Sequence, residues 1–339
     1  MDIRRLQKIK GGSFTLSLPK GWVEKRRLES GEQIAVIEEE DGSLRVFPVS
    51  SAAEKLFEVT LSLDDYRSLR ALEYVIGTYY IQGSHKISIT SKETISAEDK
   101  HRLKLLRIEL PGMEVAEEKS DRLSFQVLID PSIFSLESLI EKTASFSLHL
   151  QEDAVQSMVE SDYKLAAEVM ERSREALRHY RMTIRQVALA SLSKTLAKKV
   201  GVRSCQECIT FALVARDLNR LVYHSTSIAN HVSTLKEKKD FSKEILDTVA
   251  GISQVICKMQ EKAVQAFLKK DVKLAISVMG RMKEMREREK MLLKTVIGEI
   301  KDVDTAVAVS MIARDLRRIA GYAVAIADDA MNRILTPKP

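Results

Sequence analysis

The feature that most constrains this chain is a long segment without proline. No proline occurs from Ser132 to Thr336, and only five glycines fall in that segment. Proline disrupts a helix from within, because its ring removes an N–H donor and clashes with the preceding turn. The segment therefore predicts a helical region. The first 131 residues instead hold four prolines and eight glycines, with period-two alternation that indicates strands.

The helical region repeats itself. Residues 215–230 match residues 313–328 at seven of 16 positions, and shorter matches precede both segments. This predicts two copies of one unit, at 135–237 and 241–336, joined near 236–240, each with three helices. We expect Asp162 and Asp271 to act as helix N-caps. The third helix of each copy carries a seven-residue pattern typical of bundles: Phe211, Leu218, Ser225 and Val232 with Val214, Leu221 and Ile228, then Val309, Leu316, Ala323 and Ala330 with Ile312, Ile319 and Ile326.

Residues 1–50 predict a small β module. Gly11-Gly12 supplies a turn before a strand over 13–18, a short helix follows at 20–25, and strands at 33–38 and 43–48 flank Asp41-Gly42, a hairpin signal. So few large apolar residues can hardly form a core, so we expect the module to close by pairing with a second copy. Residues 55–131 alternate strands with helices at 64–82 and 97–108, which predicts a small α/β domain.

The positive charge is concentrated at the start of the chain. Lysine and arginine number 54 and aspartate and glutamate 48, an excess of +6. Residues 1–27 account for it alone, with Asp2 and Glu24 against eight basic residues: Arg4, Arg5, Lys8, Lys10, Lys20, Lys25, Arg26 and Arg27. Such a field predicts a polyanionic partner. We predict that most of the eight contact DNA phosphates and that Arg4, Arg5 and Arg26 reach base edges; the alternative is a solvated basic end.

Other chemistry is sparse. Three cysteines (Cys205, Cys208, Cys257) and the lack of a signal-peptide pattern predict a reducing cytoplasm. Cys205 and Cys208 open a helix that Ser204 and Glu207 are expected to cap reciprocally; a redox role or half a zinc site competes there with simple packing. His224 and His231 can share a helix face, and Trp22 is expected to pack rather than to stack on bases. No nucleotide-binding or catalytic motif and no membrane-spanning run occurs, so we predict no enzyme activity, no cofactor and no membrane insertion.

Two stretches resemble known families. Ala-Arg-Asp-Leu-x-Arg-(Leu/Ile), then Ile-Ala-(Asn/Asp), with Asp-x-Lys-Leu-Ala upstream in each copy, resembles the PhoU family of phosphate-signalling proteins over about residues 137–336. The sequence of residues 6–23, with Leu28-x-x-Gly-Glu32 and Asp41-Gly-Ser-Leu44, resembles the AbrB/SpoVT swapped-hairpin DNA-binding domain. With the α/β insert, the whole chain resembles archaeal-type PhoU-like regulators of phosphate uptake.

The PhoU resemblance implies a metal site that this sequence does not keep. Members hold iron or zinc through a Glu-x-x-x-Asp motif and an acidic residue on the preceding helix. The matching positions are Asn219, Tyr223 and Ser173 in the first copy and Arg317, Gly321 and Met282 in the second. We therefore expect no metal of that type. The retained acidic residues are expected to form helix-surface pairs, Asp217 with Arg220 and Asp315 with Arg318.

These observations predict a mainly α, multidomain protein: an AbrB-like swapped hairpin, a small α/β domain and tandem PhoU-like three-helix bundles. The predicted function is that of a cytoplasmic, homodimeric transcriptional regulator of phosphate uptake and homeostasis. The basic N-terminal domain would bind operator DNA while the bundles receive the signal. The alternative is an adaptor whose bundles dock on a phosphate transporter ATPase subunit or a sensor kinase, with the N-terminal domain only dimerising.

Overall fold

The structure is a computed structural model that describes residues 3–38, 42–49, 57–235 and 242–335, apart from the side chain of Cys205. The chain divides into two compact units. The N-terminal module consists of residues 1–56 with 337–339, and the main unit of residues 57–336. Asp41 of the expected hairpin turn and the expected junction at 236–240 lie outside the described residues.

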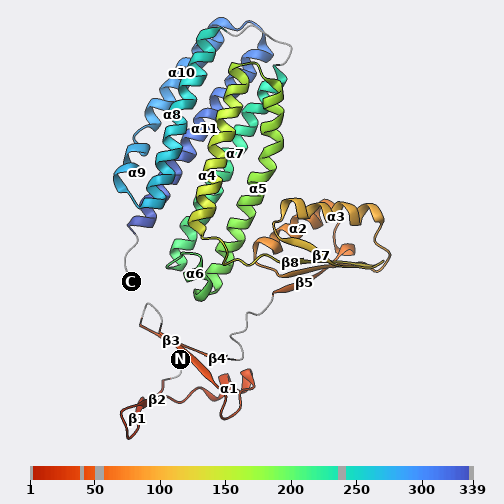
Figure 1. The fold of residues 1–339 in the computed structure, drawn as a ribbon, viewed down its shortest axis with the longest axis vertical. Helices are drawn as coiled ribbons and strands as arrows, with labels where there is room; N and C mark the ends of the chain where they lie inside the picture. Colours follow the sequence, from red (N-terminus) through yellow and green to blue (C-terminus); the bar gives the residue numbers. More distant parts are fainter. Residues whose placement is uncertain (1–2, 39–41, 50–56, 236–241, 336–339) are drawn as a thin grey trace. The chain divides into compact units, whose positions relative to one another are not determined.

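The N-terminal module contains two small hairpins and one helix (Figure 1). Strands β1 (Gln7–Lys8) and β2 (Phe14–Thr15) pair antiparallel. Gly11 and Gly12 between them have φ of 116° and 95°, a region that glycine enters at no steric cost. Helix α1 (Lys20–Arg26) follows Pro19, and β3 (Ile34–Glu38) pairs antiparallel with β4 (Leu44–Pro48). The elements follow the order expected from the sequence.

The N-terminal module buries almost nothing by itself. Among its described residues only Pro48 is buried. Its large apolar side chains stand in solvent, for example Phe14 at 60% exposure and Leu44 at 64%. The described part of the module therefore has no hydrophobic core of its own.

The main unit begins with an α/β domain. Strands β5 (Glu58–Ser62), β6 (Lys86–Thr90), β7 (Met113–Glu118) and β8 (Arg122–Val127) form one sheet in the order β5-β6-β8-β7. The β5–β6 pair is parallel and the other two pairs are antiparallel. Helices α2 (Leu69–Ile81) and α3 (Ala97–Glu109) cover one face of the sheet (Figure 1). They bury a core that includes Leu72, Ile76, Tyr80, Leu103 and Phe125.

Two details of the α/β domain differ from the sequence-based expectation. Helix α2 begins at Leu69, because a 3₁₀ turn, η2 (Leu63–Asp65), precedes it and Ser68 caps it. Strand β7 was not expected at all. Its glutamates and a register shift between Val115 and Glu117 interrupt the alternation that normally reveals a strand.

Helices fill the rest of the main unit. The first copy of the repeat contains α4 (Leu136–Val159), α5 (Tyr163–Leu192), α6 (Lys194–Lys199) and α7 (Cys205–Thr234). The second contains α8 (Lys243–Lys269), α9 (Val272–Met279), α10 (Met282–Glu299) and α11 (Val303–Ile334). Asp162 and Asp271 cap α5 and α9 as predicted. The expected middle helix of the second copy is broken at Gly280 and Arg281, where glycine weakens the helix and Arg281 supplies no side-chain cap.

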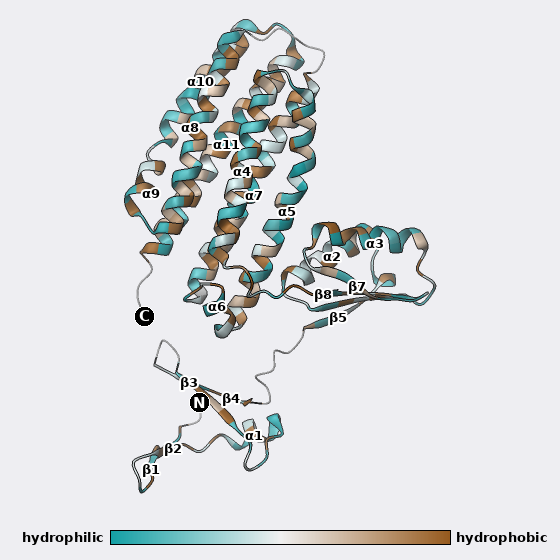
Figure 2. Cartoon of the chain, in the orientation of Figure 1, coloured by the Kyte–Doolittle hydropathy of each residue, from teal (hydrophilic) through white to brown (hydrophobic). Residues whose placement is uncertain are grey.

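The two copies share one hydrophobic core rather than forming two separate bundles. All positions of the predicted seven-residue pattern are buried, which confirms α7 and α11 as central helices. These two helices make the most extensive helix pair of the described structure. Each long helix shows both hydrophobic and hydrophilic residues, as an element with one buried face should (Figure 2).

A buried arginine ties four helices together at one end of the bundle. Arg333 of α11 bonds through Nε to Glu207 of α7 (2.8 Å) and through Nη2 to Glu137 of α4 (2.6 Å). Its Nη1 donates to the Phe267 carbonyl of α8 (3.0 Å), and its guanidinium lies over both the Phe211 and the Phe267 ring, 4.7 and 4.6 Å from their centroids. Glu207 is thus part of this cluster. One half of the expected reciprocal cap is confirmed, because the Glu207 N–H donates to Ser204 Oγ (3.2 Å), whereas the Glu207 carboxylate accepts from the Arg203 N–H (2.8 Å).

Replacement of Arg333 by methionine should destabilise the protein by about 3–5 kcal/mol, since it leaves the carboxylate of Glu207 buried without its main partner. Chemical denaturation of the full chain measures this. Arg281→Met is the matched control, because Arg281 pairs with Glu284 at the surface and its loss should cost under about 1 kcal/mol. Equal losses in the two variants would contradict a special role for the Arg333 cluster.

Candidate functional site

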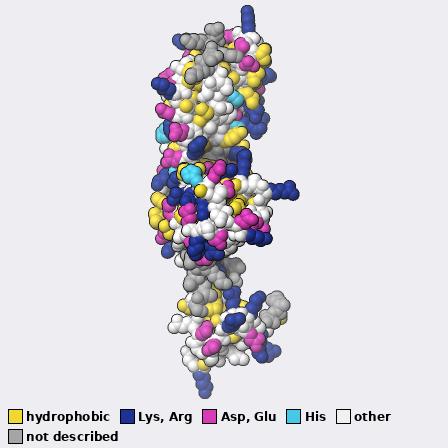
Figure 3. Space-filling model, turned by 90° about the vertical axis from the view of Figure 1, so that its right-hand side faces the viewer, with side chains coloured by type: hydrophobic (Ala, Val, Ile, Leu, Met, Phe, Trp, Pro, Cys, Tyr) yellow, Lys and Arg dark blue, Asp and Glu magenta, His cyan; other side chains and the backbone are white. Residues whose placement is uncertain are grey.

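The eight basic residues predicted to bind DNA all lie exposed on the N-terminal module. Arg4 and Arg5 precede β1, Lys8 lies in β1 and Lys10 at the start of the turn after it. Lys20, Lys25 and Arg26 lie on α1, with Arg27 as its C-cap. Figure 3 shows lysine and arginine side chains standing out from this module. All eight residues are therefore exposed, and they lie on two neighbouring stretches of the chain.

Most of these cations are available to a partner. Lys20 makes a long ion pair with Glu24 (3.7 Å), and Arg4 has a contact within the chain. The other six make no ion pair within the described part of the chain: Arg5, Lys8, Lys10, Lys25, Arg26 and Arg27. When a cation without an internal ion pair binds phosphate, no contact within the protein has to be broken, and counterions are released from the DNA.

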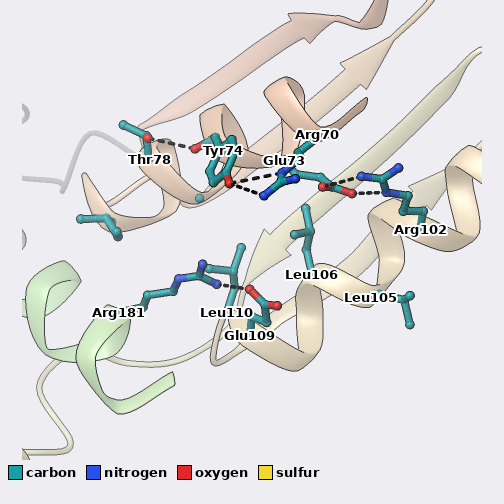
Figure 4. A pocket seen from close by; sticks show the side chains of 12 residues that line it. Arg70, Glu73, Tyr74, Thr78, Arg102, Leu105, Leu106, Glu109, Leu110 and Arg181 are labelled. Carbon is teal, nitrogen blue, oxygen red and sulfur yellow. Dashed lines mark hydrogen bonds and ion pairs between the residues drawn. The ribbon is translucent and has the colours of Figure 1, made fainter. Parts of the chain in front are cut away.

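A second candidate site lies in the main unit, where the α/β domain meets the bundle (Figure 4). We call it the junction pocket; its volume is about 580 Å³, and α2, α3 and α5 line it. Arg102 holds Glu73 in a bidentate pair (2.6 and 3.0 Å), and Arg181 of α5 holds Glu109 (2.6 Å). Arg70 directs Nε and Nη2 at the Tyr74 hydroxyl (3.3 and 3.2 Å).

Arginines of α5 hold the walls of this pocket in place. Arg178 donates to the Ile108 carbonyl (2.8 Å), and buried Arg185 donates to the carbonyls of Tyr80 (2.5 Å) and Ser84 (3.0 Å). These carbonyls lie at or next to the C-terminal ends of α3 and α2, where unpaired carbonyls and the helix dipole favour cations. Arg185 also lies over the Tyr80 ring, and burial raises the pKa of that phenol to about 12.

Sequence reasoning missed the junction pocket. Its lining follows helical spacing on α2, at 70, 73, 74, 77, 78 and 81, and on α3, at 102, 105, 106, 109 and 110. That spacing was available as a signal. The contribution of Arg181, from a distant helix, was not, because only folding brings α5 against α2 and α3.

In the first copy, the positions that the family resemblance assigns to a metal do meet in space, but their chemistry does not suit a metal. Ser173 of α5 and Asn219 and Tyr223 of α7 line one hollow of about 440 Å³, whose remaining lining is also uncharged. In the second copy Arg317 pairs with Glu289 of α10 through Nε (2.8 Å), so a cation of the protein already neutralises the carboxylate there. Neutral amides, hydroxyls and a guanidinium do not replace the carboxylates that iron or zinc requires.

A buried polar seam joins α7 to α11. The repeat offset of 98 residues relates Asp217 to Asp315, His224 to Tyr322 and His231 to Asp329. Asp315 lies within hydrogen-bonding distance of His224 (Oδ1 to Nδ1, 2.8 Å) and 3.8 Å from His231 (Oδ2 to Nε2), so both histidines do share a face. The expected pairs with Arg220 and Arg318 are wrong: Asp217 binds Arg216 instead, and Asp315 turns inward to the histidines.

The other half of the seam brings carboxylates together. Asp217 and Asp329 are both buried. Burial above all, then the charges of Asp217 and Asp328, raise the pKa of Asp329 to about 7, while Arg216 opposes the shift. Burial raises the pKa of Asp217 as well. One proton is therefore favoured at this point of the seam near neutral pH.

Asp329→Asn should remove a pH dependence of folding. Because the folded pKa of Asp329 lies above its unfolded value of 3.8, the wild type loses stability as pH rises from about 4 through about 7. The melting temperature of the variant should exceed that of the wild type by a larger margin near pH 8 than near pH 5, measured by thermal unfolding. Asp328→Asn, at an exposed neighbour, should change melting less. A uniform offset at both pH values would refute this.

No helix among the described residues is long and apolar enough to span a membrane, and those residues hold no cluster of three or more His, Cys, Asp or Glu side chains that could bind a metal ion.

The helical bundle is the part of the chain that is similar to known proteins. The PhoU domain matches residues 140–232 and 249–330, slightly more than half of the chain. A PhoU structure from Pseudomonas aeruginosa is similar at a TM-score of 0.53 and 20% identity, covering 58% of this chain and 93% of that one. The phosphate transport system regulatory protein PhoU from Streptococcus pneumoniae is similar at 0.50 and 18%, covering 60% and 95%. These two similarities show a common fold. The search of curated proteins found no match to this chain. With both repeat copies matched, the chain belongs to the PhoU domain family.

Proposed function

We propose that this protein regulates phosphate transport and that it does so by binding DNA as a dimer through its N-terminal module. Membership of the PhoU family supports the first part, since the structural relative from Streptococcus pneumoniae is named as a phosphate transport system regulatory protein. The resemblance of residues 6–44 to the AbrB/SpoVT and archaeal-type regulators supports the second.

The observation that carries DNA binding is the exposure of the eight basic residues. They stand on the surface of a module whose first 27 residues carry the whole net charge of +6. Two copies would bring twelve excess charges to one site, enough to contact phosphates on both sides of a groove. A solvated basic end would not require so many cations within two short neighbouring elements.

Dimerisation follows from the missing core of the module. Phe14 of β2, Val36 of β3 and Leu44 of β4 are each more than half exposed. Pairing with the same surface of a second copy would remove them from water, at about 25 cal/mol for each Å² covered. The shared core would then come from two chains, as in the swapped hairpin that the sequence resembles.

The alternative function, an adaptor, has its own support. About 60% of this chain matches nearly the full length of the two PhoU structures, so their fold is complete without an N-terminal module. In that case the bundle itself would dock on a transporter ATPase subunit or a sensor kinase, and the module would only pair the chains.

Removal of residues 1–56 should abolish DNA binding, because the cations lie there. The full chain should bind operator-length DNA with an affinity that falls steeply with salt, and Arg26→Gln with Arg27→Gln should flatten that dependence. Lys198→Gln with Lys199→Gln, exposed cations of the main unit, is the control and should change neither. Unchanged affinity and salt dependence in residues 57–339 would contradict DNA binding through the module. No DNA binding by the full chain at low salt, with a transporter ATPase subunit co-purifying on the bundle, would support the adaptor instead.

The full chain should sediment as a dimer and residues 57–339 as a monomer. The main unit carries both hydrophobic core clusters, so this fragment is expected to fold by itself. Analytical ultracentrifugation over a concentration series measures the difference. A dimer of residues 57–339 as tight as that of the full chain would assign dimerisation to the main unit.

A further inference from the structure

The junction pocket combines cations with a preset orientation. Glu73 accepts hydrogen bonds from Nε and Nη2 of Arg102, and Glu109 accepts one from Nη1 of Arg181. Each arginine is thereby held in one orientation, and its other N–H groups can still donate to a ligand. Arg70 has no carboxylate partner among the described residues. Side chains held in this way lose little further entropy when a ligand binds.

The pocket also provides an apolar surface beside these cations. Leu106 lines it, and Tyr74 is 62% exposed. Gly77 adds depth, since a Cβ built there would meet no atom within 4 Å. An arginine group next to an aromatic face suits a ligand with an anionic end and a flat or apolar body.

The lining favours a phosphoryl group at the anionic end. Three guanidinium groups, of Arg70, Arg102 and Arg181, line one pocket of about 580 Å³, within the range of small-molecule sites. The two glutamates are already paired, and Arg70 adds a cation that neither of them neutralises. The N–H groups of a guanidinium match the spacing of phosphate oxygens. A doubly charged phosphate monoester can accept hydrogen bonds from several arginines, whereas a single carboxylate typically pairs with one.

We propose that the junction pocket binds a small molecule that carries a phosphoryl group, and that this molecule is an effector of the regulator. The effector role rests on the proposed function in phosphate transport; the binding site does not. Arg70 and Arg102 belong to the α/β domain and Arg181 to the bundle, so a bound phosphoryl group joins the two parts. Such a ligand stabilises their contact, as binding to the folded state does in general.

The test is calorimetric titration of the full chain with AMP, adenosine and inorganic phosphate. AMP carries a phosphate monoester on an aromatic body, and it should bind and raise the melting temperature, whereas adenosine should do neither. Arg70→Gln should weaken AMP binding at least tenfold. Arg107→Gln is the matched control, since Arg107 also lies on this domain but pairs with Glu114 away from the pocket, and it should bind AMP as the wild type does.

The arms of the experiment separate the sources of the phosphoryl group. Inorganic phosphate that binds as tightly as AMP, with the same loss in Arg70→Gln, identifies the free anion as ligand and supports the site. No binding of AMP or phosphate, or equal binding by Arg70→Gln and Arg107→Gln, overturns it. That result would leave DNA binding by the N-terminal module untouched, and loss of DNA binding would leave the pocket untouched.

Discussion

The main unit depends on the contact between α7 and α11. These helices come from the two copies of the repeat, and their small and apolar side chains allow one core to run through both copies. At its ends and along its length the contact carries charge: Arg333 with Glu207, Asp315 with the two histidines, and Asp329 near Asp217. Packing provides the stability, while these buried polar groups fix the register, since a shifted helix would leave them unpaired in the core.

The two copies have diverged where the family resemblance places a metal. In the first copy the positions surround an uncharged hollow, and in the second Arg317 binds Glu289 across α10 and α11. An ion pair within the protein can hold two helices together as a shared cation would, without the desolvation of several carboxylates around a metal. The family fold is therefore kept while the chemistry at its surface has changed.

The α/β domain is joined to the bundle through α5. Arg178, Arg181 and Arg185 lie on one face of that helix and reach the ends of α2 and α3. Three helix-end contacts make the domain an extension of the bundle, so a ligand bound at the junction would contact both parts. The N-terminal module differs, because it lacks a hydrophobic core within the described residues.

The sequence by itself determined the helical region, its repeat, the N-caps and the buried positions of α7 and α11, because periodicity and capping are local properties of the chain. It also located the exposed cations of the N-terminal module. Only the tertiary structure decided the single core, the break between α9 and α10, the inward pairing of Asp315 with His224, and the junction pocket. Each of these features depends on contacts with side chains from a helix that is distant in the sequence. The helical spacing of residues does not reveal which distant side chains will make those contacts.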